Sequence, residues 1–174
     1  GPEIKKFASQ NFKLLAKAAK EKGYSKSTPS AWKRNSVLPV PLFRKFSDKI
    51  GKDALFFKLS GNSKPIPCKI QVTDNFLNIV GLWLADGSYD NKNAVIISTP
   101  DCKGEICEFA QSIGLNVKTH SDGFSYIISG VSLVFFFKNI LGLVGNAYTK
   151  KFPAWVYNLS KGQLGELLMG LYSG

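Results

Sequence analysis

The sequence predicts an α+β fold, and three observations carry this prediction. Apolar residues recur at helical spacing in segments such as 4–22 and 101–114. Segments 94–99 and 124–129 are rich in β-branched and aromatic residues and end at turn-forming residues, which indicates strands. The two kinds of segment alternate after residue 74. With 174 residues, 44% of them hydrophobic, the chain can bury the core of one ordinary domain and a small appendage.

The positive charge is concentrated at the front of the chain. Residues 1–52 hold 13 Lys and Arg against 3 Asp and Glu, whereas the rest holds 10 against 9. The cluster of turn-forming residues at 61–67 separates the two parts. We therefore predict a basic helical segment over 1–60, a linker over 61–73 and a body over 74–174. Such a basic segment suits a polyanion, because Lys and Arg near phosphates release condensed counterions; the alternative is a solvated helical surface.

The basic segment has the outline of a helix-turn-helix. A helix over 4–22 ends at Gly23, a short polar element follows around Trp32, and another helical pattern runs through Leu42, Phe46 and Ile50. In that motif the short second element enters the major groove of DNA. Prolines nearby also fit an ordinary loop between packed helices. The candidate DNA-contacting residues are Lys26, Ser27, Ser30, Lys33, Arg34 and Asn35.

The body begins with a helix over 74–85, with Asp74 as its expected N-cap. Its apolar residues point in nearly every direction, so this helix must be buried on most sides. We then expect a turn over 89–93, a strand over 94–99, a helix over 101–114, strands over 116–120 and 124–129 joined by a hairpin at 121–123, and a helix over 132–143. A last helix over 160–172 starts at Ser160 and Gln163, which have capping-box spacing.

Several classes of protein are not expected. The three cysteines form no CxxC pair and His120 is the single histidine, so a zinc site or disulfide framework is not indicated. The longest apolar run, 131–137, is far shorter than the roughly 20 residues that span a bilayer, so no membrane partner is expected. No apolar signal-peptide region follows the first residues. We expect an intracellular protein, in the cytoplasm or nucleoid, or in an organelle if intron-encoded.

The stretch 79–87 carries the chemistry. Gly81 and Ala85 are four residues apart and form a groove on one helix face where a second helix can approach closely. Asp86 follows at the end of the helix, where a carboxylate faces the negative end of the helix dipole. A divalent cation such as Mg²⁺ would relieve this cost, and Gly87 could leave the helix in a left-handed turn. The alternative is a solvent-exposed aspartate in a turn.

This stretch resembles the LAGLIDADG motif of homing endonucleases, with Gly81, Leu82, Ala85, Asp86 and Gly87 at the motif positions. Residues 163–174 resemble a second copy, in which Gly170, Leu171 and Gly174 match Gly81, Leu82 and Ala85. The resemblance covers roughly 74–174 and implies an αββαββα half-domain with a mixed sheet. The two motif helices would pack through Gly81, Ala85, Gly170 and Gly174.

The resemblance implies a Mg²⁺-dependent, site-specific endonuclease that hydrolyses double-stranded DNA. Metal ions would lie at Asp86 and at the end of the second motif, Gly174, after which the second acid would stand. This chain is then a fragment that does not complete a two-acid site; the extended chain would be a pseudo-dimeric monomer, and a homodimer is the alternative. An intein origin is possible on this resemblance but is not indicated by splicing residues.

The same resemblance assigns further residues. Lys150, in the segment 150–153 that resembles a Lys-x-x-Pro element, would belong to the catalytic neighbourhood, with Lys151 as the fallback and a solvated lysine pair as the alternative. DNA bases would be read from one face of the sheet. By strand alternation the candidates are Lys92, Asn93, Ser98, Lys118, His120 and Ser125. The alternative function is a DNA- or RNA-binding regulator or maturase that does not cleave.

Overall fold

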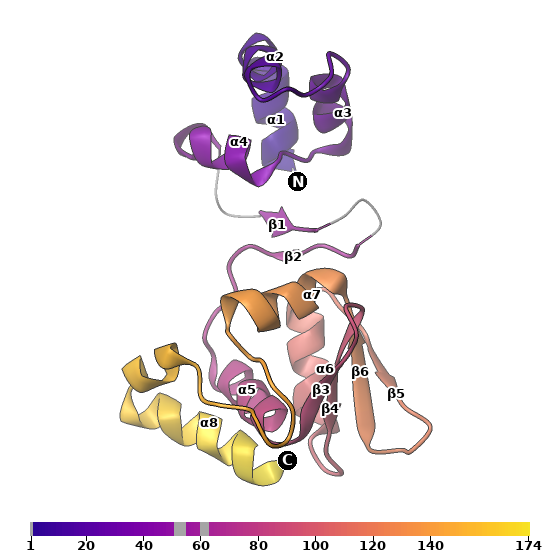
Figure 1. Ribbon diagram of the computed structural model, residues 1–174, viewed down its shortest axis with the longest axis vertical. Helices are drawn as coiled ribbons and strands as arrows, with labels where there is room; N and C mark the ends of the chain where they lie inside the picture. Colours follow the sequence, from indigo (N-terminus) through magenta and orange to yellow (C-terminus); the bar gives the residue numbers. More distant parts are fainter. Residues whose placement is uncertain (1, 51–54, 60–62) are drawn as a thin grey trace. The chain divides into compact units, whose positions relative to one another are not determined.

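The computed structural model describes residues 2–50, 55–59 and 63–174, and confirms an α+β class. The chain forms two compact units, Gly1–Phe56 and Phe57–Gly174 (Figure 1). Each unit has a hydrophobic core of its own. The boundary therefore lies at residue 56, close to the expected end of the basic segment at residue 60. Each unit is described by itself below.

The N-terminal unit is helical. Its elements are α1 (Pro2–Gln10), α2 (Phe12–Glu21), α3 (Thr28–Asn35), α4 (Val40–Lys45) and the 3₁₀ turn η1 (Ser47–Lys49). Its core gathers the apolar faces of the helices around residues such as Phe7, Leu15 and Trp32. The helix expected over 4–22 is divided at Asn11, whose side-chain amide donates to the carbonyl of Phe7. The backbone N–H of Asn11 donates to the same carbonyl, and Asn11 itself departs from helical geometry (φ −120°, ψ 31°).

The segment after this unit is not a free linker. Strand β1 (Phe56–Phe57) pairs with β2 (Ile66–Pro67), and Ile66 is 1% exposed within the core of the second unit. Of the turn cluster predicted at 61–67, residues 61 and 62 lie outside the described residues. A buried isoleucine anchors the 63–67 stretch to the body, so the expected linker is wrong for that stretch.

The second unit continues as α5 (Asp74–Asp86), β3 (Gly87–Asp90), β4 (Ala94–Ser98), α6 (Lys103–Ser112), β5 (Val117–Thr119), β6 (Ser125–Ser129) and α7 (Val131–Phe135). This is the predicted order αββαββα. The sheet order is β3-β4-β6-β5, and all three pairings are antiparallel. The expected mixed sheet is therefore wrong: two hairpins join through their inner strands β4 and β6, which run in opposite directions.

One face of this sheet builds the core. Val95 and Ile97 of β4 face the same way as their partners Ile128 and Tyr126 of β6, and all four are buried with α5, α6 and α7. A π-helix, η2 (Phe136–Ile140), continues α7, where one continuous α-helix was expected. The chain then forms the 3₁₀ helix η3 (Ala154–Asn158) and ends in α8 (Lys161–Ser173). In Figure 1 α8 lies alongside α5.

Helix ends and turns differ from the predictions in three places. The N-cap of α5 is Thr73, whose hydroxyl accepts from the backbone of Phe76, rather than Asp74. Gly87 leaves α5 in an extended conformation (φ −88°) and starts β3, so the left-handed turn is wrong. The turn expected over 89–93 is shorter, over 91–93 with Asn91 at positive φ, because residues 89 and 90 belong to β3. The capping box of α8 at Ser160 and Gln163 is confirmed.

Membrane-spanning helices are not found in the described part of the chain. No helix within residues 2–50, 55–59 and 63–174 combines the length and the apolar character needed to cross a bilayer.

Candidate functional site

Helices α5 and α8 approach each other through glycines. A Cβ atom placed on Gly81 would overlap the backbone of Leu167 and Gly170, and one placed on Gly170 would overlap the backbone of Asn78. Gly174 reaches the side chain of Ala85 in the same way. The four residues predicted as the helix interface therefore do lie between the two helices. At Gly81 and Gly170 the backbones are so close that no side chain fits, which is why the sequence carries glycine at these two positions.

The close packing of α5 and α8 fixes the C-terminal end of α5, where Asp86 is exposed. Gly87 is buried against the Trp83 ring, and this contact directs the chain into β3. Asp86 borders an open cleft of about 480 Å³ whose walls also include Tyr89, Asn91, Lys138 and Lys150. The structure thus brings the two predicted catalytic residues, Asp86 and Lys150, into one cleft.

Lys150 closes the end of α5. Its Nζ donates to the carbonyl oxygens of Trp83 (2.8 Å) and Ala85 (3.3 Å), and lies 4.8 Å from the centre of the Trp83 ring. A cation at a helix C-terminus balances the helix dipole. The Trp83 carbonyl thus accepts both from the backbone N–H of Gly87 and from Lys150. We expected a divalent cation to supply positive charge at this helix end. The Lys150 ammonium supplies part of that charge.

Two pKa shifts mark this cleft. Partial burial lowers the pKa of Lys150 below its ordinary value, while the negative charge of Asp86 opposes the shift. Burial raises the pKa of Tyr89, whose hydroxyl donates to the carbonyl of Leu143 at 2.7 Å. Tyr89 therefore stays neutral and serves as a fixed wall of the cleft.

The protein atoms around Asp86 offer few free ligands for Mg²⁺. Among the described residues no group of three or more His, Cys, Asp or Glu side chains could hold a metal ion. Asp86 supplies a hard carboxylate, whereas the carbonyls of Trp83 and Ala85 already accept from Lys150. Mg²⁺ commonly binds through one or two carboxylates, water and substrate phosphates. Asp86 alone could therefore contribute a protein carboxylate to a Mg²⁺ ion here, and the other ligands would have to come from water or a substrate phosphate. Gly174 offers backbone atoms alone.

Four of the six candidate base-reading residues, Ser98, Lys118, His120 and Ser125, share the sheet face opposite the core, whereas Lys92 and Asn93 lie in a turn. Lys118 pairs with Ile127, and His120 donates its backbone N–H to Ser125, which places all three candidates of β5 and β6 on the side opposite the core. Lys92 and Asn93 are exposed in the β3–β4 turn. Ser125 differs from the rest: it is 8% exposed and its hydroxyl is hydrogen-bonded to that of Ser98 at 2.9 Å. The Ser125 hydroxyl is therefore engaged within this face and offers little exposed surface for contact with a base.

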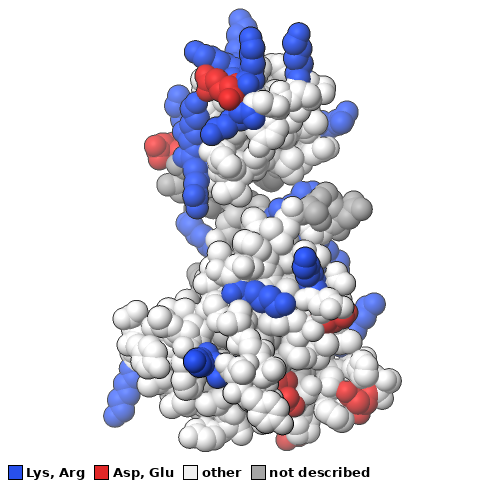
Figure 2. Space-filling model, viewed as in Figure 1, with Lys and Arg blue, Asp and Glu red and all other residues white. Residues whose placement is uncertain are grey.

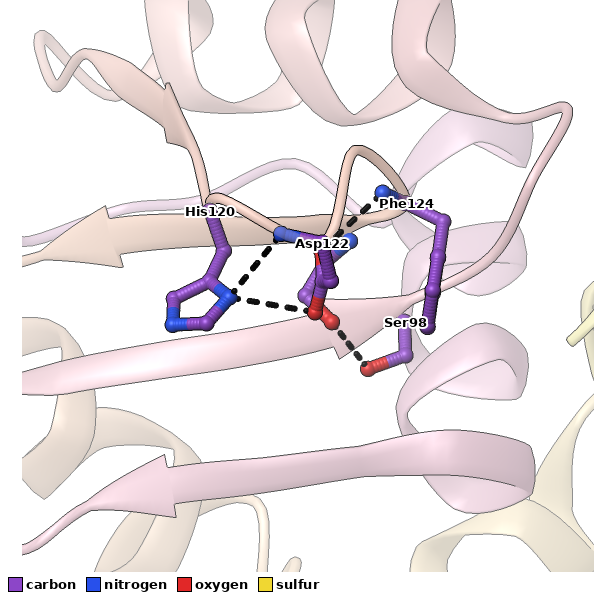
Figure 3. Close-up of polar contacts among 5 residues, drawn as sticks. Ser98, His120, Asp122 and Phe124 are labelled. Atoms are coloured by element: carbon purple, nitrogen blue, oxygen red, sulfur yellow. Dashed lines mark hydrogen bonds and ion pairs between the residues drawn. The ribbon is translucent and has the colours of Figure 1, made fainter.

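A polar cluster orders the β5–β6 turn (Figure 3). The Asp122 carboxylate accepts from the backbone N–H groups of Phe124 (3.0 Å) and Ser125 (2.9 Å), and lies 3.1 Å from Nδ1 of His120. Hydrogen bonding from Ser125 lowers the pKa of Asp122 to about 2. Because Nδ1 faces Asp122, the other ring nitrogen of His120 is the one left for a partner outside the turn.

The basic residues of the N-terminal unit gather on its surface, as Figure 2 shows. Ser30, Lys33 and Arg34 of α3 line one shallow basin of about 470 Å³ together with Lys5 and Phe12. Lys26 and Ser27 are exposed at the start of α3, where the Ser27 hydroxyl is hydrogen-bonded to that of Ser25. The sequence pattern did not single out Lys5 or Phe12, because they belong to α1 and α2, which meet α3 only in the fold.

Sequence reasoning also missed Lys138 and Tyr89 in the cleft. Tyr89 fell in a predicted turn, and Lys138 only marked the end of an apolar run. No motif joins these positions, so the structure alone could bring them to Asp86.

Comparison with known proteins leaves the family open. No family model matches the chain. The chain is similar to an uncharacterized protein of Methanocaldococcus jannaschii, with 27% identity over 152 residues that cover 79% of this chain. It spans 17% of the length of that relative.

Proposed function

We propose that this protein is a LAGLIDADG-type homing endonuclease, a Mg²⁺-dependent, site-specific nuclease of double-stranded DNA. One observation carries the proposal: Asp86 ends a helix that meets α8 through Gly81 and Gly170, and opens into a cleft that also holds Lys150. A close helix pair that ends in a carboxylate is the arrangement that the sequence motif implies. The order αββαββα supports the same assignment.

Each part of the chain has a role in this proposal. Asp86 would hold the metal, which supplies Lewis-acid activation of the phosphodiester and of water when it is bound. Lys150 would place positive charge beside the charge that develops on phosphate oxygens. The outer sheet face would read bases, and the basin on α3 would bind the DNA backbone.

The position of α8 bears on the assembly. Because α8 occupies the Gly81 face of α5, two copies could not pair through α5 without displacing their own α8. This supports the pseudo-dimeric single chain over the homodimer. In the proposal the partner of Asp86 is the residue that would follow Gly174, as the alignment of the two motifs implies.

A DNA- or RNA-binding regulator or maturase is the second candidate. The observation that favours it is the lining of the cleft. Of the described residues that line the cleft, Asp86 is the one that carries a carboxylate. Such a protein would use the same basic surfaces for binding and would need no metal.

Cleavage tests decide between the two. The protein, extended past Gly174 along its coding DNA, is incubated with a plasmid library of randomised targets in Mg²⁺ or in EDTA. We expect linear products that require Mg²⁺ and that disappear in Asp86→Asn, which retains DNA binding. Asp90→Asn, on the neighbouring strand, serves as the matched control and should cleave. Binding without cleavage by the unmodified protein under every metal condition would overturn the endonuclease in favour of the second candidate.

A further inference from the structure

We propose that Lys138 is a second phosphate-binding cation of the cleft, linked to Lys150 through the contacting rings of Trp83 and Tyr89. The inference rests on the proposed function, since it names a further contact between this same cleft and nucleic acid. No sequence motif contains Lys138; its place in the cleft follows from contacts among four side chains.

The four side chains form one continuous row. The Nζ atom of Lys150 lies 4.8 Å from the centre of the Trp83 ring, the Trp83 and Tyr89 ring centres are 5.0 Å apart, and the Nζ atom of Lys138 lies 4.3 Å from the centre of the Tyr89 ring. Each ammonium thus rests on the face of an aromatic ring, which attracts cations. The ring pair fixes both lysines at the edge of the cleft that Asp86 borders.

The partners of Lys138 leave its charge uncompensated. Its Nζ donates to the backbone carbonyl of Asn91 at 3.3 Å, and no carboxylate of the described residues lies within ion-pair distance of it. A ring face and a carbonyl orient an ammonium without neutralising it, and an ammonium has three N–H donors. Lys138 therefore presents a positioned, unneutralised cation to the cleft.

A phosphodiester is the ligand that this arrangement fits. The two ammonium groups come from different segments, η2 and the loop before η3, and meet one open cleft of about 480 Å³. Lysine binds phosphate oxygens as a point charge and needs no fixed approach geometry. We assign Lys150 to the phosphate nearest Asp86 and Lys138 to a neighbouring phosphate of the same DNA backbone.

The experiment measures binding of a short mixed-sequence DNA duplex in EDTA over a range of salt concentrations. Each phosphate contact contributes about 0.9 to the slope of log affinity against log salt. We expect Lys138→Gln to reduce the slope by about 0.9 and, from that slope, to weaken binding roughly eightfold at about 0.1 M salt. Lys138→Arg should keep the slope. Lys103→Gln, at an exposed lysine of α6, is the matched control and should behave like the unmodified protein.

Two outcomes would overturn the inference, and they separate it from the proposed function. An unchanged slope in Lys138→Gln, with salt-dependent binding retained, would show that Lys138 only stabilises the β3–β4 turn through the Asn91 carbonyl. The endonuclease proposal would remain intact. The same reading follows if affinity falls while the slope stays. If the unmodified protein binds DNA without any salt dependence, the proposed function fails and the inference fails with it.

Discussion

The ammonium of Lys150 donates to the carbonyl oxygen of Trp83 at 2.8 Å, across 67 positions of sequence. This contact places a cation at the negative end of α5, beside the carboxylate of Asp86. The helix end, the acid and the lysine therefore form one electrostatic unit, in which a change to any member alters the others.

The first prediction concerns the pKa of Lys150. Burial lowers this pKa and the charge of Asp86 raises it. Asp86→Asn removes the opposing contribution, so we expect the pKa of Lys150 to fall further below 10.5. The measurement is a side-chain NMR titration of the Lys150 ammonium. Asp90→Asn, whose carboxylate is not among the causes of the shift, should leave it unchanged; a rise in Asp86→Asn would contradict the electrostatic unit.

The second prediction concerns the contact between α5 and α8. Gly81→Ala and Gly170→Ala would each place a methyl group into the backbone of the opposite helix, so the helices must separate. We expect each to lower the free energy of unfolding by about 1–3 kcal/mol, the usual cost of overpacking. The measurement is urea denaturation.

Gly165→Ala is the matched control for the glycine variants. It lies on the same helix α8 with nothing near its would-be Cβ atom, so alanine should stabilise the protein by roughly 0.5–1 kcal/mol through helix propensity alone. Equal effects at positions 81, 170 and 165 would show that propensity, and not close packing, explains these glycines.

Part of this structure could be predicted from local pattern. The apolar circumference of α5, the capping box of α8 and the alternation of β5 and β6 were read correctly, because each depends on residues close together in sequence. The Gly81 and Gly170 faces were also found, since spacing of four residues is enough to define a helix face.

The failures arise where tertiary contacts decide. Asp74 was expected as the N-cap, yet the cap is Thr73, because the capping position is the residue that adopts the extended conformation before the helix. Residues 89 and 90 of β3 fell in a predicted turn, because this short strand gains strand character only from pairing with β4. The roles of Tyr89 and Lys138 depend on ring contacts that no sequence spacing specifies.

The third prediction concerns the turn between β5 and β6. The pKa of Asp122 is lowered to about 2 by hydrogen bonds, so its stabilising contribution is present above its ordinary pKa of 3.8 and is lost as the pH falls through about 2. Ser125→Ala removes the side-chain hydrogen bond of Ser125, the largest cause of the shift, and should raise the pKa of Asp122 toward 3.8. Carboxylate NMR titration measures it. A titration of Asp122 near 3.8 in the unmodified protein would refute this account of the turn.

The last prediction concerns the basin on the N-terminal unit. Lys33 and Arg34 line it with Lys5 and are exposed, so both can meet DNA phosphates. The double variant Lys33→Gln, Arg34→Gln should reduce the salt slope of duplex binding by about 1.8, from about 0.9 for each contact. Lys45→Gln is the control, because its ammonium already lies 3.2 Å from a carboxylate oxygen of Glu21. The double variant removes two charges and the control removes one. If the control lowers the slope by half as much as the double variant, then general positive charge, and not this basin, binds the DNA.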